Sequence, residues 1–191
     1  TAEATGALGA AVAFTATATD VSSVTIAYSQ GPGTVFPLGA TTVTVTATDA
    51  HGNTSRGSFE VTVRDTTAPA LSVPADVVAE AASPAGAAVT FPAATATDAV
   101  SGVTIAYSHE SGAGFALGTT VVTVTATDGA LNAVSRTFTV TVRDTTAPLL
   151  TVPADIVVEA ASAAGAAVAF AATATDAVSA VTIAYSHQPG S

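Results

Sequence analysis

Apolar and polar residues alternate with a period of two along most of this chain. In the segment Phe-Thr-Val-Thr-Val-Arg, Phe138, Val140 and Val142 take every second position, with Thr residues between them and Arg143 at the end. Because successive side chains of a strand point to opposite faces, this spacing predicts a half-buried β-strand. Val and Thr, which are both β-branched, favour the same conformation. We find no segment with the 3.6-residue spacing of an amphipathic helix.

Segments rich in Gly and Pro interrupt the alternating stretches and limit the expected strands. In the central part of the chain, the pattern predicts strands at 71–80, 86–97, 102–108, 115–117, 119–127 and 134–143. Short strands at this spacing are typical of an antiparallel β-sandwich. The pattern therefore predicts an all-β chain.

The chain also repeats itself with a period of about 79 residues. The hexapeptide Arg-Asp-Thr-Thr-Ala-Pro begins at Arg64 and again at Arg143. This periodicity predicts a repeat without its first strand at 1–64, a complete repeat at 65–143 and a repeat truncated after its third strand at 144–191. We expect a piece of a longer array, but the incomplete ends are also compatible with strand exchange between molecules.

The repeated hexapeptide has the composition of a short, stiff linker between repeats. Its final Pro fixes φ, and the residue before a Pro is pushed toward an extended conformation. Such a linker limits bending between the domains that it joins.

Composition and charge narrow the possible functions. The chain has 4 basic and 14 acidic residues, a net charge of -10 and no Cys. Nucleic-acid binding is not expected, because phosphates are neutralised by basic residues. The longest uncharged stretch, 21–48, alternates Thr with Val and contains Pro, so no membrane insertion is expected. The motifs of common hydrolases and phosphate-binding enzymes do not occur, and we predict that the chain is not an enzyme.

Ordered motifs over essentially the whole chain resemble the hyalin-repeat (HYR) domain. They are Asp-Thr-Thr-Ala-Pro with a following Val-Pro-Ala-Asp, then Leu-Gly-Thr-Thr with Thr-Val-Thr-Ala-Thr-Asp, and finally Phe-Thr-Val-Thr-Val-Arg. The resemblance implies tandem immunoglobulin-like antiparallel β-sandwiches joined by short linkers, as in bacterial surface proteins. It also implies an extracellular or cell-surface location, a role in adhesion or structural spacing, and no catalytic residues.

The chain departs from this family in one respect. Many HYR domains carry a Cys pair, and the matching positions here are Tyr28 with Val45 and Tyr107 with Val124. An apolar contact is therefore expected in place of the crosslink. A disulfide in such a position typically stabilises a fold by about 2–4 kcal/mol.

Acidic residues recur at the ends of the predicted strands. The topology of an immunoglobulin-like sandwich leads us to expect Asp65, Asp98, Asp128 and Asn132 close together, where the linker enters the complete repeat. Carboxylate and amide oxygens suit Ca²⁺, which takes 6–8 oxygen ligands. These residues therefore predict an interdomain calcium site. The matching residues in the other repeats are Asp20, Asp49, Asn53, Asp144 and Asp176.

A simpler interpretation of the same residues needs no ion. Asp at the end of a strand commonly accepts backbone N–H groups in an Asx-turn, and the sequence does not decide between this role and a cation. The acidic residues Asp76, Asp155, Glu80 and Glu159 are predicted to be solvated charges at strand edges, which discourage edge-to-edge pairing.

These features together predict an extracellular structural or adhesive repeat protein. In this interpretation tandem sandwiches form a rod, stalk or filament, and the partners are neighbouring copies of the same repeat. The alternative is a spacer or carbohydrate-binding accessory region of a large secreted enzyme. A carbohydrate-binding region would need an exposed aromatic platform, and the chain has no Trp and 3 Tyr.

Overall fold

A computed structural model describes residues 1–190, and the regular elements in this range are β-strands. Because this part of the chain contains no α-helix, it contains no helix that could cross a membrane. The all-β prediction is confirmed. The chain divides into two compact units, and the first consists of Thr1–Val73, Ala94–Tyr107 and Val124–Arg136, while the second contains the remaining described residues.

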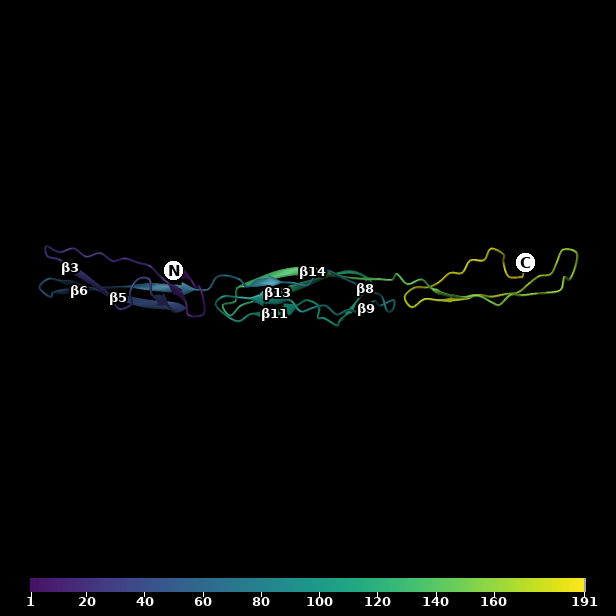
Figure 1. Cartoon of the computed structure of the whole chain (residues 1–191), viewed down its shortest axis with the longest axis horizontal. Coiled ribbons are helices and arrows are strands. Elements are labelled where there is room, and N and C mark those ends of the chain that lie inside the picture. The colour runs from purple at the N-terminus through teal and green to yellow at the C-terminus, as the bar shows by residue number, and fades with distance from the viewer. Residues whose placement is uncertain (191) are drawn as a thin grey trace. The chain divides into compact units, whose positions relative to one another are not determined.

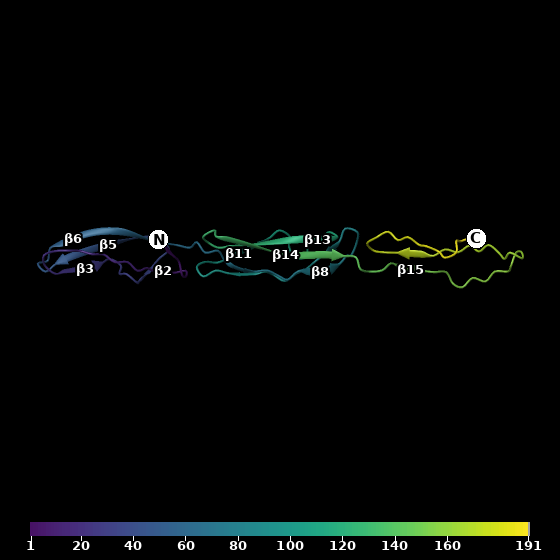
Figure 2. The same ribbon diagram turned by 90° about the horizontal axis from the view of Figure 1, so that it is seen from above.

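The first repeat is built on a four-stranded sheet (Figures 1 and 2). Its strands are β1 (Ala2–Glu3), β2 (Ala10–Ala11), β3 (Val24–Tyr28), β4 (Val35–Phe36), β5 (Gly39–Asp49) and β6 (Thr54–Arg64). The sheet has the order β1-β6-β5-β3, and β2 pairs with β4 beside it. Strand β5 is antiparallel to both of its neighbours, whereas the edge strand β1 is parallel to β6.

The second repeat has the same arrangement and adds one pair of strands. Its strands are β7 (Ala70–Ser72), β8 (Val77–Glu80), β9 (Ala87–Ala88), β10 (Thr95–Thr97), β11 (Thr104–Tyr107), β12 (Gly114–Phe115), β13 (Gly118–Thr127) and β14 (Ala133–Arg143). The large sheet has the order β11-β13-β14-β8, with β8 parallel to β14. The added pair is β7 with β10, and β9 pairs with β12. This arrangement is the expected immunoglobulin-like sandwich.

Two predicted strands are each divided in the structure. The expected strand 71–80 consists of β7 and β8, which pair with different partners on either side of Pro74. The expected strand 86–97 consists of β9 and β10, and Pro92 lies between them. Pro has no N–H to donate to a ladder, so the chain leaves one pairing partner there and joins another.

A Tyr in each repeat helps to hold the segment that, in the second repeat, passes from β9 to β10. The Tyr107 hydroxyl accepts a hydrogen bond of 2.6 Å from the Ala94 N–H. Tyr28 makes the same contact with Ala16 at 3.0 Å, and Tyr185 with Ala172 at 2.9 Å. The recurring Tyr therefore satisfies a backbone donor that no strand partner reaches.

The alternating pattern correctly identifies the core of the second repeat. Phe138, Val140 and Val142 are 3%, 0% and 1% exposed, while Arg143 is exposed. The cross-strand neighbours that replace the Cys pair are also confirmed, since Tyr28 lies opposite Val45 and Tyr107 lies opposite Val124. The apolar side chains of one strand face are therefore the main source of stability in this repeat.

In the third repeat the structure describes two short strands. They are β15 (Leu149–Thr151) and β16 (Thr173–Thr175), which pair antiparallel. Several large apolar side chains of this region are exposed, including Leu150 at 56% and Val157 at 95%.

A tight turn after β8 leads to a prediction about Gly86. Its φ is +105°, and a Cβ at this position would lie 1.9 Å from the Phe115 carbonyl oxygen. We expect Gly86→Ala to destabilise the chain by about 2 kcal/mol or more, because both the backbone conformation and the contact become unfavourable. Chemical denaturation would measure this loss. Gly114→Ala is the control, because a Cβ there meets open space, and equal losses for the two variants would contradict the prediction.

Candidate functional site

The linker after the first repeat is held by Glu3, the last residue of β1. Because β1 runs parallel to β6, Glu3 lies opposite Arg64 and next to the start of the linker. Its carboxylate accepts hydrogen bonds from the Thr66 N–H at 2.9 Å, the Thr66 hydroxyl at 2.6 Å and the Thr67 hydroxyl at 2.7 Å. These bonds lower the pKa of Glu3. One carboxylate therefore fixes two successive linker residues.

Glu80 holds the second linker in the same way. Its carboxylate accepts two bonds from Thr145, at 2.9 and 2.6 Å, and two from Thr146, at 3.1 and 2.8 Å. These bonds, mainly those from Thr145, lower the pKa of Glu80 to about 2. Glu80 and Asp76 are exposed, and Glu80 ends the edge strand β8, as predicted. The prediction missed their hydrogen-bond partners, since Asp76 Oδ1 also accepts a bond of 2.7 Å from the Thr139 N–H. The sequence pattern could not show which partner each carboxylate meets.

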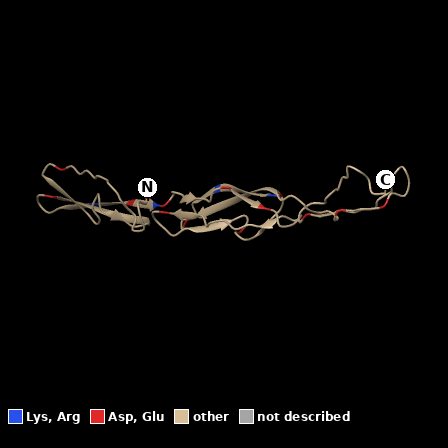
Figure 3. Ribbon diagram, turned by 45° about the vertical axis from the view of Figure 1, so that its right-hand side comes forward, with Lys and Arg blue, Asp and Glu red and all other residues tan. Residues whose placement is uncertain are grey.

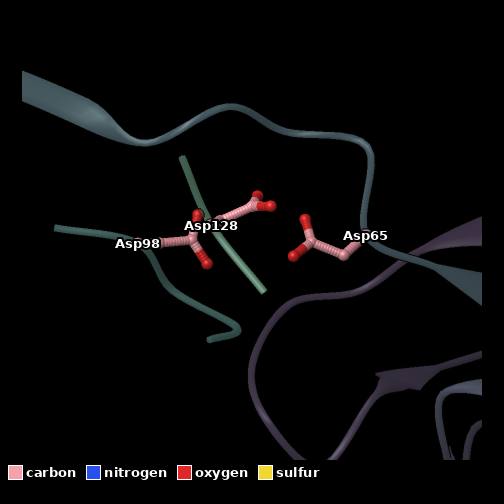
Figure 4. Close-up of side chains that lie close together, drawn as sticks. All are labelled: Asp65, Asp98 and Asp128. Carbon is pink, nitrogen blue, oxygen red and sulfur yellow. The ribbon is translucent and has the colours of Figure 1, made fainter. Parts of the chain in front are cut away.

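Three carboxylates from distant parts of the sequence come together beside the first linker. Oxygens of Asp65, Asp98 and Asp128 all lie within 4.8 Å of one another, and Figure 4 shows the three side chains directed toward a common space. All three residues belong to the first compact unit. They form the one such group of three or more among the described residues, although acidic residues (red) occur along the whole ribbon in Figure 3. The predicted convergence is confirmed.

Backbone N–H groups orient two of these carboxylates. Oδ1 of Asp98 accepts bonds from Val100 and Ser101 at 2.8 and 2.9 Å, which lower the pKa of Asp98. Oδ1 of Asp128 accepts bonds from the Ala130 and Asn132 N–H groups, at 2.9 and 2.8 Å. The Asx-turn interpretation is therefore correct for both residues. It does not exclude a ligand, because each turn presents a carboxylate to the same space.

Asp65 differs from its two neighbours. Its Oδ1 accepts a long bond of 3.3 Å from the Thr67 N–H, while its Oδ2 is buried and has no hydrogen-bond partner. Loss of hydration raises the pKa of Asp65, and the charges of Asp98 and Asp128 raise it further. A buried oxygen without a donor, among like charges, is an unfavourable arrangement for the protein alone.

Asn132 joins the linker to the Asp128 turn. Its side-chain Nδ2 donates to Asp128 Oδ2 at 2.8 Å and to the Asp65 backbone carbonyl at 3.3 Å. Asn132 therefore lies at the cluster, as expected, and its amide nitrogen braces the two acidic residues.

The other candidate ligands form local turns. In the first repeat, Asp49 accepts bonds from the His51 and Asn53 N–H groups and from Asn53 Nδ2, all at 2.8 Å, and Asp20 Oδ1 accepts the Ser22 N–H at 2.9 Å. In the third repeat, Asp176 Oδ1 accepts the N–H groups of residues 178 and 179, and Asp144 is exposed. Among the described residues, none of these positions is part of a three-carboxylate group.

Sequence reasoning missed the role of Val100. This residue follows the Asp98 turn, is 8% exposed and belongs to the apolar cluster of the first repeat with Ala4, Ala10 and Val63. The Asp98 turn therefore presents one apolar side chain to the core of the preceding repeat. The signal in the sequence was an apolar residue inside the turn that follows the Asp. The same signal occurs in the third repeat at Val178, which is also buried.

Comparison with known proteins identifies one family by sequence alone. The HYR domain family matches residues 2–63 and 64–142. Hyalin of Lytechinus variegatus is 41% identical over 147 residues, which are 72% of this chain and 28% of that hyalin. Hyalin of Strongylocentrotus purpuratus is 37% identical over 156 residues, which are 76% of this chain and 13% of that protein. The chain thus spans a small part of both relatives.

A solved structure also shares similarity with the chain. The protocadherin gammaB7 EC3–6 cis-dimer structure is 18% identical, with a TM-score of 0.34 over 82% of this chain and 52% of that chain.

The bonds to Glu80 predict a specific acid dependence. Because its pKa is lower in the folded state than the ordinary 4.5, the stabilisation is complete above about pH 4.5 and is lost as the pH falls toward about 2. A carboxyl-carbon NMR titration should show a midpoint for Glu80 near 2. In a Thr145→Val, Thr146→Val variant we expect the midpoint to move upward, because two hydroxyl donors are lost. A Glu80 midpoint unchanged by this substitution would contradict the assignment.

Proposed function

The chain belongs to the HYR domain family, and from this premise we propose that it is an extracellular structural and adhesive segment. Two consecutive HYR matches that together cover most of the chain carry this proposal. The similarity to hyalins supports the same role. In this role the tandem sandwiches form a rod, stalk or filament, and neighbouring copies of the same repeat are the partners.

The contacts at the first linker support the function of a stiff spacer. Glu3 fixes Thr66 and Thr67, Val100 enters the apolar cluster of the preceding repeat, and Asn132 binds the Asp65 carbonyl. Each contact joins residues that are far apart in the sequence, so bending at the linker would break several of them together. A short linker with such contacts transmits force between repeats better than a flexible one.

We extend the proposal to a Ca²⁺ ion at Asp65, Asp98 and Asp128. The residues present suit this ion, because three carboxylates surround one space and the buried Asp65 Oδ2 has no other partner. A divalent cation would supply the missing interaction and offset the loss of hydration and the repulsion that together raise the Asp65 pKa. Ca²⁺ would then stiffen the linker that carries Asp65.

The location is tested on cells that express the full-length protein. Antibodies against this chain should label intact, unpermeabilised cells or the matrix around them. Beads coated with the chain should also aggregate with one another if the repeats adhere to copies of themselves. Labelling that appears only after permeabilisation would refute the extracellular role, and dispersed beads would refute self-adhesion.

The calcium proposal predicts that Asp65→Asn changes stability in opposite directions with and without the ion. In chelator we expect the variant to melt above the wild type, because it removes a poorly hydrated charge from between Asp98 and Asp128. This advantage should shrink as the pH falls, since a raised pKa means that wild-type Asp65 then becomes protonated in the fold. Ca²⁺ at about a hundred times its Kd should raise the wild-type melting temperature by about 5 °C or more.

The matched control is Asp49→Asn. Asp49 makes the same turn bonds as Asp128 but stands outside the three-carboxylate group. This variant should keep the full response to Ca²⁺, whereas Asp65→Asn should lose most of it. Calorimetry that detects no Ca²⁺ binding to the wild type would refute the site and leave the extracellular role untouched.

A further inference from the structure

The second repeat contains a parallel pair of strands, β8 and β14 (Figure 1). The carboxyl end of β14 runs beside β8, from Val140 opposite Val77 to Arg143 opposite Glu80. In the sequence, β8 follows the first linker, and β14 leads directly into the second linker. A force on the two linkers therefore reaches β8 from its amino end and β14 from its carboxyl end.

Parallel strands that are pulled in this way must slide past each other. The bonds between parallel strands are evenly spaced along the pair, so they resist sliding together and must break together. Strands that are pulled apart at the same end instead lose their bonds one after another. Sliding has the higher barrier for this reason, and forced unfolding is governed by the rate at which the barrier is crossed.

Further hydrogen bonds extend the pairing beyond both ends of β8. Before the strand, Asp76 Oδ1 accepts a bond of 2.7 Å from the Thr139 N–H. After the strand, the Ala81 N–H donates to the Arg143 carbonyl, also at 2.7 Å. The parallel pair is therefore longer than the strands themselves.

The Glu80 carboxylate continues the same series of bonds into the second linker. It accepts the N–H and hydroxyl groups of Thr145 and of Thr146, at distances from 2.6 to 3.1 Å. Hydrogen bonds to a charged acceptor are stronger than those between neutral groups. Because both Thr residues lie beyond the end of β14, the linker cannot slide along β8 without breaking these bonds.

We infer that residues 76–81 and 139–146 form a mechanical clamp, which keeps the second repeat folded when force acts through its linkers. All of these residues belong to the second compact unit. The inference rests on the proposed structural function, to which it adds resistance to force. It involves neither the acidic cluster nor a second molecule, so it is tested in chelator on single molecules. Its failure would leave the extracellular location and the calcium site untouched.

Because the sequence contains no Cys, two introduced thiols can define the direction of pull. Ala68 and Ala147 are exposed residues at matching positions of the two linkers. An Ala68→Cys, Ala147→Cys variant of the full chain, attached to DNA handles in optical tweezers, pulls the clamp in the sliding direction. Only the residues between the handles lengthen, so the unfolding event belongs to the second repeat.

The matched control moves one handle to the other end of β8. In an Ala82→Cys, Ala147→Cys variant, both handles lie at the carboxyl ends of the paired strands, so the same bonds are peeled apart in turn. Ala82 is exposed, as Ala68 is. We expect the unfolding force to be about twofold or more higher in the sliding direction. An equal or lower force in that direction would overturn the inference.

A second comparison tests the contribution of Glu80. In the sliding direction, Glu80→Ala should unfold about tenfold or more faster than the parent at the same force, because the bonds to the linker are lost. In the peeling direction the change should be smaller, since those bonds no longer act together with the others. Glu110→Ala, which removes an exposed carboxylate from a loop of the same repeat, is the control and should match the parent. An equal effect of Glu80→Ala in both directions, or none, would show that the linker is not part of the clamp.

Discussion

The arrangement of the first linker depends on hydrogen bonds from Thr66 and Thr67 to Glu3. Glu3 can reach these residues because β1 lies parallel to β6 and ends where the linker begins. A carboxylate with several donors is held more firmly than a neutral acceptor, since charge-assisted hydrogen bonds are the stronger ones. Asp65 precedes the two bound Thr residues, so its place beside Asp98 and Asp128 follows from this contact.

Attractive and repulsive interactions meet at the same linker. Burial of Val100 in the first repeat's apolar cluster favours close approach of the Asp98 turn. The same approach brings Asp98 and Asp128 to Asp65, whose pKa rises because its charge loses hydration and meets like charges. A cation would relieve the second effect without weakening the first. The linker is therefore a place where ion binding would act directly on the stiffness of the chain.

The first two repeats show how burial depends on the strand that covers a sheet. Val45 and Val124 occupy equivalent positions opposite Tyr28 and Tyr107, yet Val124 is fully buried and Val45 is not. The difference lies in β7, which covers the second repeat with Leu71. The pairing of β7 with β10 therefore contributes directly to the core of the second repeat.

The sequence by itself determined the repeat, the strands and the face of each strand that is buried. The buried face follows from a period of two, which is a local property that Phe138, Val140 and Val142 display directly. It also placed Asp65, Asp98 and Asp128 together, since strand ends in a sandwich of known topology meet at one pole. The divisions of 71–80 and 86–97 were missed although Pro74 and Pro92 mark them locally, but the strands that the separate pieces join depend on distant parts of the chain. Only the tertiary structure decided that Glu80 holds Thr145, that Val100 belongs to another repeat's core and that Asp65 Oδ2 lacks a donor. These facts depend on distances between residues separated by about 35 to 65 positions or more, and no local pattern encodes such distances.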